Sequence, residues 1–188
     1  IGHRGPAIKE LIGDLQTGLR ELFRTEGPVL ISTSSATGLM EAAVRNGARS
    51  RVLSLVNGAF SQRFGQIAEA CGFEVERLEV EWGQIIAADQ VRERLASGGF
   101  DAVTVVHSET STGALNSVSE ISEAVRELDD VVLLVDSVTG LGGAEVQTDE
   151  WGLDFVLTGS QKALALPPGL AFGVASERLM ARSAAATR

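Results

Sequence analysis

The sequence predicts an α/β fold in which a mostly parallel sheet carries helices on both faces. Short apolar, β-branched runs alternate with helical patterns along the chain, and several of these runs are apolar throughout. Alternating strands and helices favour a parallel sheet, and a strand that is apolar at every position is typical of one buried on both faces. Such sheets bind ligands beyond the carboxyl ends of their strands, so the residues there are the functional candidates.

The predicted elements follow one another in a regular order. An amphipathic helix is expected at Ile8–Arg24, because aliphatic residues recur there at helical spacing. Apolar runs predict strands at Val29–Thr33, Arg51–Val56, Glu74–Val80, Ala102–His107, Val131–Asp136, Asp154–Leu157 and Ala171–Ala175. Between and after them, helical patterns are found at Leu39–Asn46, Ser61–Cys71, Ala88–Ala96, Ser119–Leu128 and Glu177–Arg182, and a short turn at Asp149–Gly152.

Composition narrows the class of protein. The 188 residues suit one domain that is large enough to bury a core. The net charge is −9 without a basic cluster, so no nucleic-acid partner is expected. The longest apolar run, Val131–Val135, is far shorter than the ~20 residues that span a bilayer, so no membrane partner is expected. No signal-peptide pattern is seen, and a cytoplasmic location is the expectation. Cys71 is the only cysteine, which excludes an internal disulfide; we expect a small apolar residue within a helix, and no metal site.

Small hydroxyl residues and an aromatic residue follow the first two strands. The segment Ser34–Gly38 either caps the next helix or leaves backbone N–H groups free for a phosphate. It is not a Walker loop, because no Gly-Lys-Ser/Thr follows. Phe60, after the turn Asn57-Gly58-Ala59, either packs in the core or stacks on a flat ligand.

Three later strands end in polar or charged residues. His107 is expected to be a hydrogen-bonded structural histidine, and a polar loop explains the hydroxyl-rich run Ser108–Gly113 as well as a binding role does. Asp136 either caps a turn or serves as a functional acid. A lone lysine such as Lys162 is usually a surface residue, but the apolar, turn-rich segment Ala163–Leu170 could exclude water from its amine.

Taken together, these residue types match the needs of one cofactor. Pyridoxal 5′-phosphate (PLP) needs a phosphate cradle at a helix start, an aromatic side chain over its ring, a carboxylate at its pyridine nitrogen and a lysine at its aldehyde. Each is present after a different strand. A nucleotide-dependent oxidoreductase is disfavoured, because the glycines after Asp136 do not form the dinucleotide fingerprint.

Longer motifs extend across nearly the whole chain. They are Gly2-His3-Arg4, Ser35-Ala36-Thr37-Gly38 with Glu41-Ala42-Ala43, Asn57-Gly58-Ala59-Phe60, His107-Ser108-Glu109-Thr110-Ser111-Thr112-Gly113, Val135-Asp136-Ser137-Val138 with Leu141-Gly142-Gly143, and Gly159-Ser160-Gln161-Lys162-Ala163-Leu164 with Pro167-Pro168-Gly169. In these motifs and their order the sequence resembles the class V PLP-dependent aminotransferases, in particular the alanine–glyoxylate and serine–glyoxylate (serine–pyruvate) types. The segment around Lys162 is the most specific of them.

The resemblance implies a fold type I large domain and a role for each motif residue. Lys162 is the implied Schiff-base lysine, which also moves the proton between Cα and C4′, and Asp136 keeps the pyridine nitrogen protonated. The implied cofactor contacts are Ser35, Ala36, Thr37 and Gln161 at the phosphate, Phe60 and Val138 on the two ring faces, and Thr110 at the ring hydroxyl. Ala36 and Thr37 stand where the family often has Gly and then His or Thr, a mild departure.

The resemblance also implies parts that this sequence does not match. Family members are longer, with an N-terminal segment at the substrate site, a C-terminal small domain that supplies an arginine for the substrate carboxylate, and phosphate contacts from a neighbouring subunit. We therefore expect residues 1–188 to form a single PLP-binding large domain that lacks efficient activity by itself. The full-length protein would be a homodimer that acts on small amino acids and 2-oxo acids.

The resemblance leaves two other assignments to consider. The family also includes chains described as soluble hydrogenase subunits, so a truncated or non-catalytic PLP-fold protein acting as a subunit or partner protein is the alternative. Cysteine desulfurases share the fold, but they place a histidine over the ring and use a cysteine loop. Phe60 stands at the ring position here, and Cys71 is predicted to lie in a helix.

Overall fold

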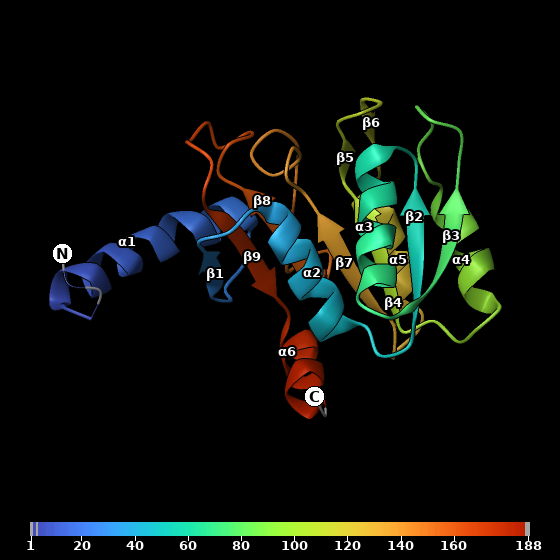
Figure 1. The fold of residues 1–188 in the computed structure, drawn as a ribbon, viewed down its shortest axis with the longest axis horizontal. Coiled ribbons are helices and arrows are strands. Elements are labelled where there is room, and N and C mark those ends of the chain that lie inside the picture. Colours follow the sequence, from blue (N-terminus) through green and yellow to red (C-terminus); the bar gives the residue numbers. More distant parts are fainter. Residues whose placement is uncertain (1, 3, 187–188) are drawn as a thin grey trace.

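The computed structural model describes residue 2 and residues 4–186, and a seven-stranded sheet forms its centre (Figure 1). Its strands follow the order β1-β9-β8-β7-β4-β2-β3. They comprise β1 (Val29–Ser32), β2 (Arg51–Val56), β3 (Glu74–Glu79), β4 (Ala102–Val106), β7 (Val132–Asp136), β8 (Phe155–Gly159) and β9 (Ala171–Ala175). All seven predicted strands are present, and their ends differ from the prediction by at most two residues. His107 and Asp154 fall just outside the strands assigned to them.

Only β9 runs against the other strands. Neighbours from β3 to β8 pair in parallel, β9 is antiparallel to β8, and β1 is antiparallel to β9. The sheet is therefore mostly parallel, as predicted. The reversal of β9 follows from its connection, because residues 160–170 return from β8 without a helix and a parallel crossover needs one. As β1 keeps the common direction, its carboxyl end lies at the same edge as those of β2, β4, β7 and β8.

Helices cover both faces of the sheet. The helices are α1 (Pro6–Phe23), α2 (Ala36–Gly47), α3 (Ala59–Ala70), α4 (Ala88–Ala96), α5 (Val118–Arg126) and α6 (Glu177–Ala185). Side chains of α2, α3 and α6 share one hydrophobic cluster with alternate strand residues such as Leu134 and Leu157. The intervening residues, such as Leu133 and Val156, pack with α4, α5 and the end of α1. The central strands are thus buried on both faces, which explains their uninterrupted apolar sequence.

A small hairpin follows β4, where the sequence left open a polar loop or a binding role. Strands β5 (Ser108–Glu109) and β6 (Ala114–Leu115) pair antiparallel and form a second sheet. Its turn contains Gly113, whose φ of +76° is in the left-handed region that glycine adopts freely. The sequence did not predict this hairpin, because strands of two residues are too short to show a periodic pattern. The hairpin fixes Glu109 and Thr110 at the carboxyl edge of the main sheet.

The first helix is only partly packed. In Figure 1, α1 extends away from the sheet, and its last turn places Phe23 in the core with no exposed surface. The aliphatic stripe predicted for this helix is present, yet Leu11, Ile12 and Leu15 are exposed on it. The earlier half of α1 therefore presents an apolar face that the described residues do not cover.

A buried ion pair joins the end of the sheet opposite the carboxyl edge to α6. Asp154, which precedes β8 and is almost fully buried, accepts hydrogen bonds from the Leu133 amide at 2.9 Å and the Ser176 hydroxyl at 2.9 Å. The Arg178 guanidinium donates to both of its oxygens, at 2.9 and 2.5 Å. This carboxylate therefore connects β7, β8 and the first turn of α6.

Replacing Asp154 by asparagine should destabilise the fold by ~1–3 kcal/mol, because an asparagine cannot accept from all the donors that the buried carboxylate satisfies. Urea unfolding followed by circular dichroism measures this change. The matched control is Glu41→Gln, which breaks the exposed pair between Glu41 and Arg45 on α2 and should cost less than ~1 kcal/mol. Equal losses in the two variants would contradict the structural role of Asp154.

Candidate functional site

One cleft at the carboxyl edge of the sheet is lined by all nine residues that the sequence nominated. They are Ser35, Ala36, Thr37, Phe60, Thr110, Asp136, Val138, Gln161 and Lys162. They come from segments after β1, β2, β4, β7 and β8, whose carboxyl ends meet at this edge. The topology thus gathers residues that lie up to 127 positions apart, from Ser35 to Lys162.

The start of α2 forms one end of the cleft. Ser35 is the N-cap residue, and its hydroxyl accepts a hydrogen bond from the Gly38 amide at 3.4 Å. The amides of Ala36 and Thr37 lie in the first turn, where no helical partner is available to them. Unpaired amides and the helix dipole together favour an anion such as a phosphate.

The Gln161 side chain lies against Gly159, beside this helix start. A Cβ atom added to Gly159 would lie 2.8 Å from the Gln161 side-chain oxygen and 3.5 Å from the Ala36 Cβ. The missing side chain at Gly159 therefore lets Gln161 fold back toward α2. The Gly-Ser-Gln-Lys motif accordingly brings the segment after β8 against the anion-binding end of the cleft.

Asp136 lies at the end of the central strand β7 with only 3% of its surface exposed. One oxygen accepts a hydrogen bond from the Val138 amide at 2.8 Å, and no donor among the described residues reaches the other. Burial raises the pKa of this carboxyl group to about 7; the Val138 amide lowers it, and the negative charge of Glu109 raises it further. A cation at the free oxygen would offset this desolvation.

Lys162 lies in a turn that Ser160 holds in place. The buried Ser160 hydroxyl donates to the Pro167 carbonyl at 2.7 Å, and its amide donates to the Leu170 carbonyl at 3.0 Å. The lysine side chain is exposed, and its amine makes no hydrogen bond or ion pair with the described residues. Of the two alternatives left open for Lys162, the described residues favour a surface position over exclusion of water by Ala163–Leu170, because most of that segment faces solvent.

The walls of the cleft include four residues that sequence reasoning missed: Met40, Val106, Ser108 and Thr139. Thr139 donates to the Ser108 carbonyl at 2.8 Å and lies 3.2 Å from the Thr110 hydroxyl. Since its single proton is used on Ser108, Thr110 is the donor between the two hydroxyls. The position of Thr139, three residues after the strand-end acid, was the signal that could have found it.

Two residues that were expected to be structural lie outside the cleft lining. His107 is buried, and its Nδ1 atom lies 3.0 Å from the Ser137 hydroxyl; burial lowers the pKa of the ring. Cys71 is half-buried at the C-cap of α3, one residue beyond the helix in which it was expected. His3, part of the first motif, lies outside the described residues.

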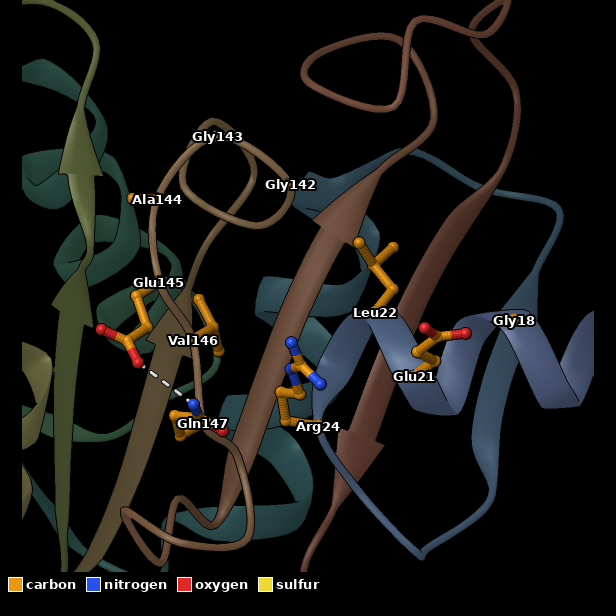
Figure 2. A pocket seen from close by; sticks show the side chains of 10 residues that line it. All are labelled: Gly18, Glu21, Leu22, Arg24, Gly142, Gly143, Ala144, Glu145, Val146 and Gln147. Carbon is orange, nitrogen blue, oxygen red and sulfur yellow. Dashed lines mark hydrogen bonds between the residues drawn. The ribbon is translucent and has the colours of Figure 1, made fainter.

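A second pocket, of about 660 Å³, lies between the end of α1 and residues Gly142–Gln147 (Figure 2). Its charged side chains are Glu21, Arg24 and Glu145, and Figure 2 shows Glu145 bonded to Gln147 rather than directed at a common point. None of the nine nominated residues lines it. Volume alone therefore does not identify the functional site, whereas the smaller cleft collects the chemically useful groups.

The residues of the cleft fit PLP. The cleft offers unpaired amides for a phosphate, a buried carboxylate with a free oxygen, an unpaired lysine amine and an aromatic side chain that is 38% exposed. A single small molecule with a phosphate, a basic ring nitrogen and an aldehyde could satisfy all of them. The described residues contain no group of three or more His, Cys, Asp or Glu side chains that could hold a metal ion, and none of their helices is long and apolar enough to cross a membrane.

Comparisons with known proteins also indicate an aminotransferase family. The family model described as aminotransferase class-V matches residues 2–184. An uncharacterized aminotransferase of Methanocaldococcus jannaschii is 42% identical over 95% of this chain and 47% of its own length. The soluble hydrogenase small subunit of Synechococcus sp. (strain PCC 6716) is 40% identical over 92% of this chain and 46% of its own.

Among solved structures, the alanine–glyoxylate aminotransferase of Nostoc sp. matches with a TM-score of 0.95 at 32% identity. The match covers 100% of this chain and 50% of that one. The chain thus spans about half the length of the curated relatives and solved structures that it matches.

Proposed function

Since the chain belongs to the class-V aminotransferase family, we propose that it forms the PLP-binding large domain of an aminotransferase. The proposed reaction moves an amino group from a small amino acid, serine or alanine, to glyoxylate or another 2-oxo acid. The similarity to a structure named alanine–glyoxylate aminotransferase supports this choice of substrates. The observation that carries the proposal is the gathering of nine nominated residues from five strand ends in one cleft.

PLP, when bound, supplies an electron sink that makes a proton on the substrate Cα acidic. The chain's own residues would bind and orient it. The first-turn amides of α2 hold the phosphate with help from Gln161. The free oxygen of Asp136 would accept a hydrogen bond from the protonated ring nitrogen and supply its counter-charge.

Lys162 has two tasks in this proposal. Its amine would hold the cofactor at the aldehyde position, and it would move a proton between the substrate Cα and C4′. Phe60 and Val138 would restrain the two ring faces, and the Thr110 hydroxyl would contact the ring hydroxyl. Serving as a proton carrier requires a mobile amine, and the Lys162 amine has no protein partner among the described residues that would restrain it.

The whole protein is proposed to act as a homodimer whose small domain and neighbouring subunit complete the substrate site. The exposed stripe of Leu11, Ile12 and Leu15 on α1 supports self-association, because contiguous exposed apolar residues favour a partner surface. In this proposal the arginine that holds the substrate carboxylate comes from the small domain.

The similarity to a hydrogenase small subunit favours one alternative, a non-catalytic PLP-fold protein that serves as a subunit or partner of another enzyme. The two functions make different demands on the cleft. An aminotransferase must hold PLP on Lys162 and exchange it with an amino acid, whereas a partner subunit needs only the fold. Cofactor binding therefore separates them.

Adding PLP to the purified chain should give a yellow protein that keeps its colour through gel filtration and loses it on addition of borohydride. Pyridoxal without the phosphate is the matched control and should bind more weakly, because it leaves the α2 amides unpaired. Because the small domain completes the substrate site in this proposal, L-serine or L-alanine should change the absorbance of the PLP-loaded full-length protein more readily than that of this chain. A chain that stays colourless with PLP would contradict the proposed function and favour the partner-subunit role.

A further inference from the structure

Glu109 is a buried carboxylate without a cation. Its side chain has no exposed surface, and no Lys, Arg or His among the described residues forms an ion pair with it. It has instead five neutral donors from two segments. One oxygen accepts from the Phe60 amide at 3.3 Å, the Ser111 amide at 3.2 Å and the Ser111 hydroxyl at 2.6 Å. The other accepts from the Ser61 amide and hydroxyl, both at 2.9 Å.

These bonds keep the carboxylate charged. Burial pushes the pKa of Glu109 upward, but the hydrogen bonds from Ser111 and Ser61 together outweigh it and leave the pKa below its usual value. The first turn of α3 adds the positive end of the helix dipole. Glu109 is therefore an anion at neutral pH.

The same bonds hold two walls of the cleft. Phe60 lies in the first turn of α3, where its amide is bound by Glu109, and the Ala59 amide donates to the Ser111 hydroxyl at 2.9 Å. Thr110 lies between Glu109 and Ser111 in the chain. One carboxylate thus fixes the backbone of both Phe60 and Thr110, which face the cleft from different elements.

The close approach of the two segments depends on Gly58. A Cβ atom at this position would lie 2.4 Å from the Glu109 Cγ atom and 2.5 Å from the Ser111 hydroxyl oxygen. Any other residue would separate the start of α3 from the β5–β6 hairpin. The glycine of the Asn-Gly-Ala-Phe motif therefore serves the contact with Glu109.

We propose that Glu109 is a positioning residue for the cofactor, a role that rests on the proposed function. Through the start of α3 and the hairpin it holds Phe60 and Thr110 against the ring, and its charge adds to the negative potential around Asp136. The second effect does not need a ligand, since the charge of Glu109 is the smallest of the causes that set the raised pKa of Asp136. A cationic ring nitrogen would gain from both carboxylates.

Glu109→Gln tests both parts of the role. Losing charge-assisted bonds to the start of α3 should weaken PLP binding about tenfold or more. Visible circular dichroism of the bound cofactor should fall, because the ring is held less rigidly. The pH midpoint of the cofactor's colour change should also move down, since removing an anion disfavours the protonated form. The titratable side chains that line the cleft among the described residues are Asp136 and Lys162.

A matched control separates positioning from stability. Asp154→Asn removes another buried carboxylate at the opposite end of the sheet, so it should weaken the fold but leave the PLP affinity and the colour midpoint unchanged. Should Glu109→Gln not fold, Ser111→Ala keeps the charge but cuts the link to Ala59, and it should reduce the visible circular dichroism. The proposal would be overturned if Glu109→Gln kept the wild-type PLP affinity, visible dichroism and colour midpoint. It would also be overturned if Ser111→Ala kept the wild-type dichroism. A wild-type chain that never binds PLP would instead refute the proposed function.

Discussion

Replacing Lys162 by alanine should abolish covalent attachment of PLP while leaving the fold intact. The lysine side chain is exposed and makes no hydrogen bond or ion pair with the described residues, so its removal takes nothing from the core. We expect the free energy of unfolding to change by less than ~0.5 kcal/mol, as is usual for a surface substitution. PLP should still enter the cleft reversibly, because the phosphate and ring contacts lie on other residues.

The chain itself offers the control, since Lys9 is its only other lysine and is exposed on α1. Wild type, Lys162→Ala and Lys9→Ala would each be incubated with PLP, reduced with borohydride and digested for peptide mapping by mass spectrometry. A pyridoxyl group should be found on the peptide that contains residue 162 in wild type and Lys9→Ala, and nowhere in Lys162→Ala beyond background reaction of the α-amino group. A label that persists in Lys162→Ala, or that maps to Lys9, would refute the assignment.

The strands could be predicted because a strand that is buried on both faces has an almost uninterrupted apolar sequence. A strand such as Val132–Asp136 packs against helices on either side, so every position but the last is apolar. The direction of β9 could not be predicted in this way, because pairing direction does not alter the apolar pattern of a strand. Only the missing helix between Gly159 and Ala171 pointed to it.

The candidate site was predictable where residues follow strand ends in sequence, as Asp136 and Lys162 do. Met40 lies on the same face of α2 as Ala36, four positions on, and that helical spacing would have found it. Glu109 was seen as one carboxylate in a polar run. Its burial depends on contacts with α3, some 48 residues earlier, and no local pattern reports such a contact.

The exposure of the segment that follows Lys162 could not be predicted, for a related reason. An apolar segment such as Ala163–Leu170 suggests burial, but burial needs a partner surface, and the described residues supply little of one. Leu166 is 52% exposed and Leu170 is 37% exposed. Composition predicts which residues favour burial, but not whether a surface is available to bury them.

Replacing Asp136 by asparagine should strengthen the cofactor-free fold at neutral pH and weaken the binding of PLP. The carboxylate is buried without a cation, and burial raises its pKa from 3.8 to about 7. The folded chain therefore holds a proton that the unfolded chain releases above pH ~4. The contribution of Asp136 to the stability of the wild-type fold is therefore largest below pH ~4. It decreases as the pH rises to about 7, where the folded chain also loses this proton, and it stays low above that pH.

Asparagine removes this loss, because it keeps an acceptor for the Val138 amide and carries no charge. Urea unfolding without PLP should show the variant more stable than wild type at pH 8, by an amount on the order of a few kcal/mol, and little different at pH ~4. Asp154→Asn gives the contrast, since that carboxylate has an arginine partner and its loss should destabilise. A wild-type chain that is at least as stable as Asp136→Asn at pH 8 would show that the carboxylate finds compensation elsewhere.

The cost of the substitution should appear only when PLP is added. The neutral amide of the Asp136→Asn variant cannot balance a protonated ring nitrogen, and removing one partner of a buried pair costs ~3–5 kcal/mol, which corresponds to at least about 100-fold in affinity. Attachment to Lys162 should survive at high PLP concentration, because the aldehyde reacts at the far side of the ring. Titration of the two proteins with PLP at pH 8 measures the difference by visible absorbance.

The Asp136→Asn variant should thus be more stable without PLP and bind PLP more weakly. This combination is expected of a carboxylate that serves its ligand and not the fold. Equal PLP affinity in the two proteins would remove Asp136 from the site.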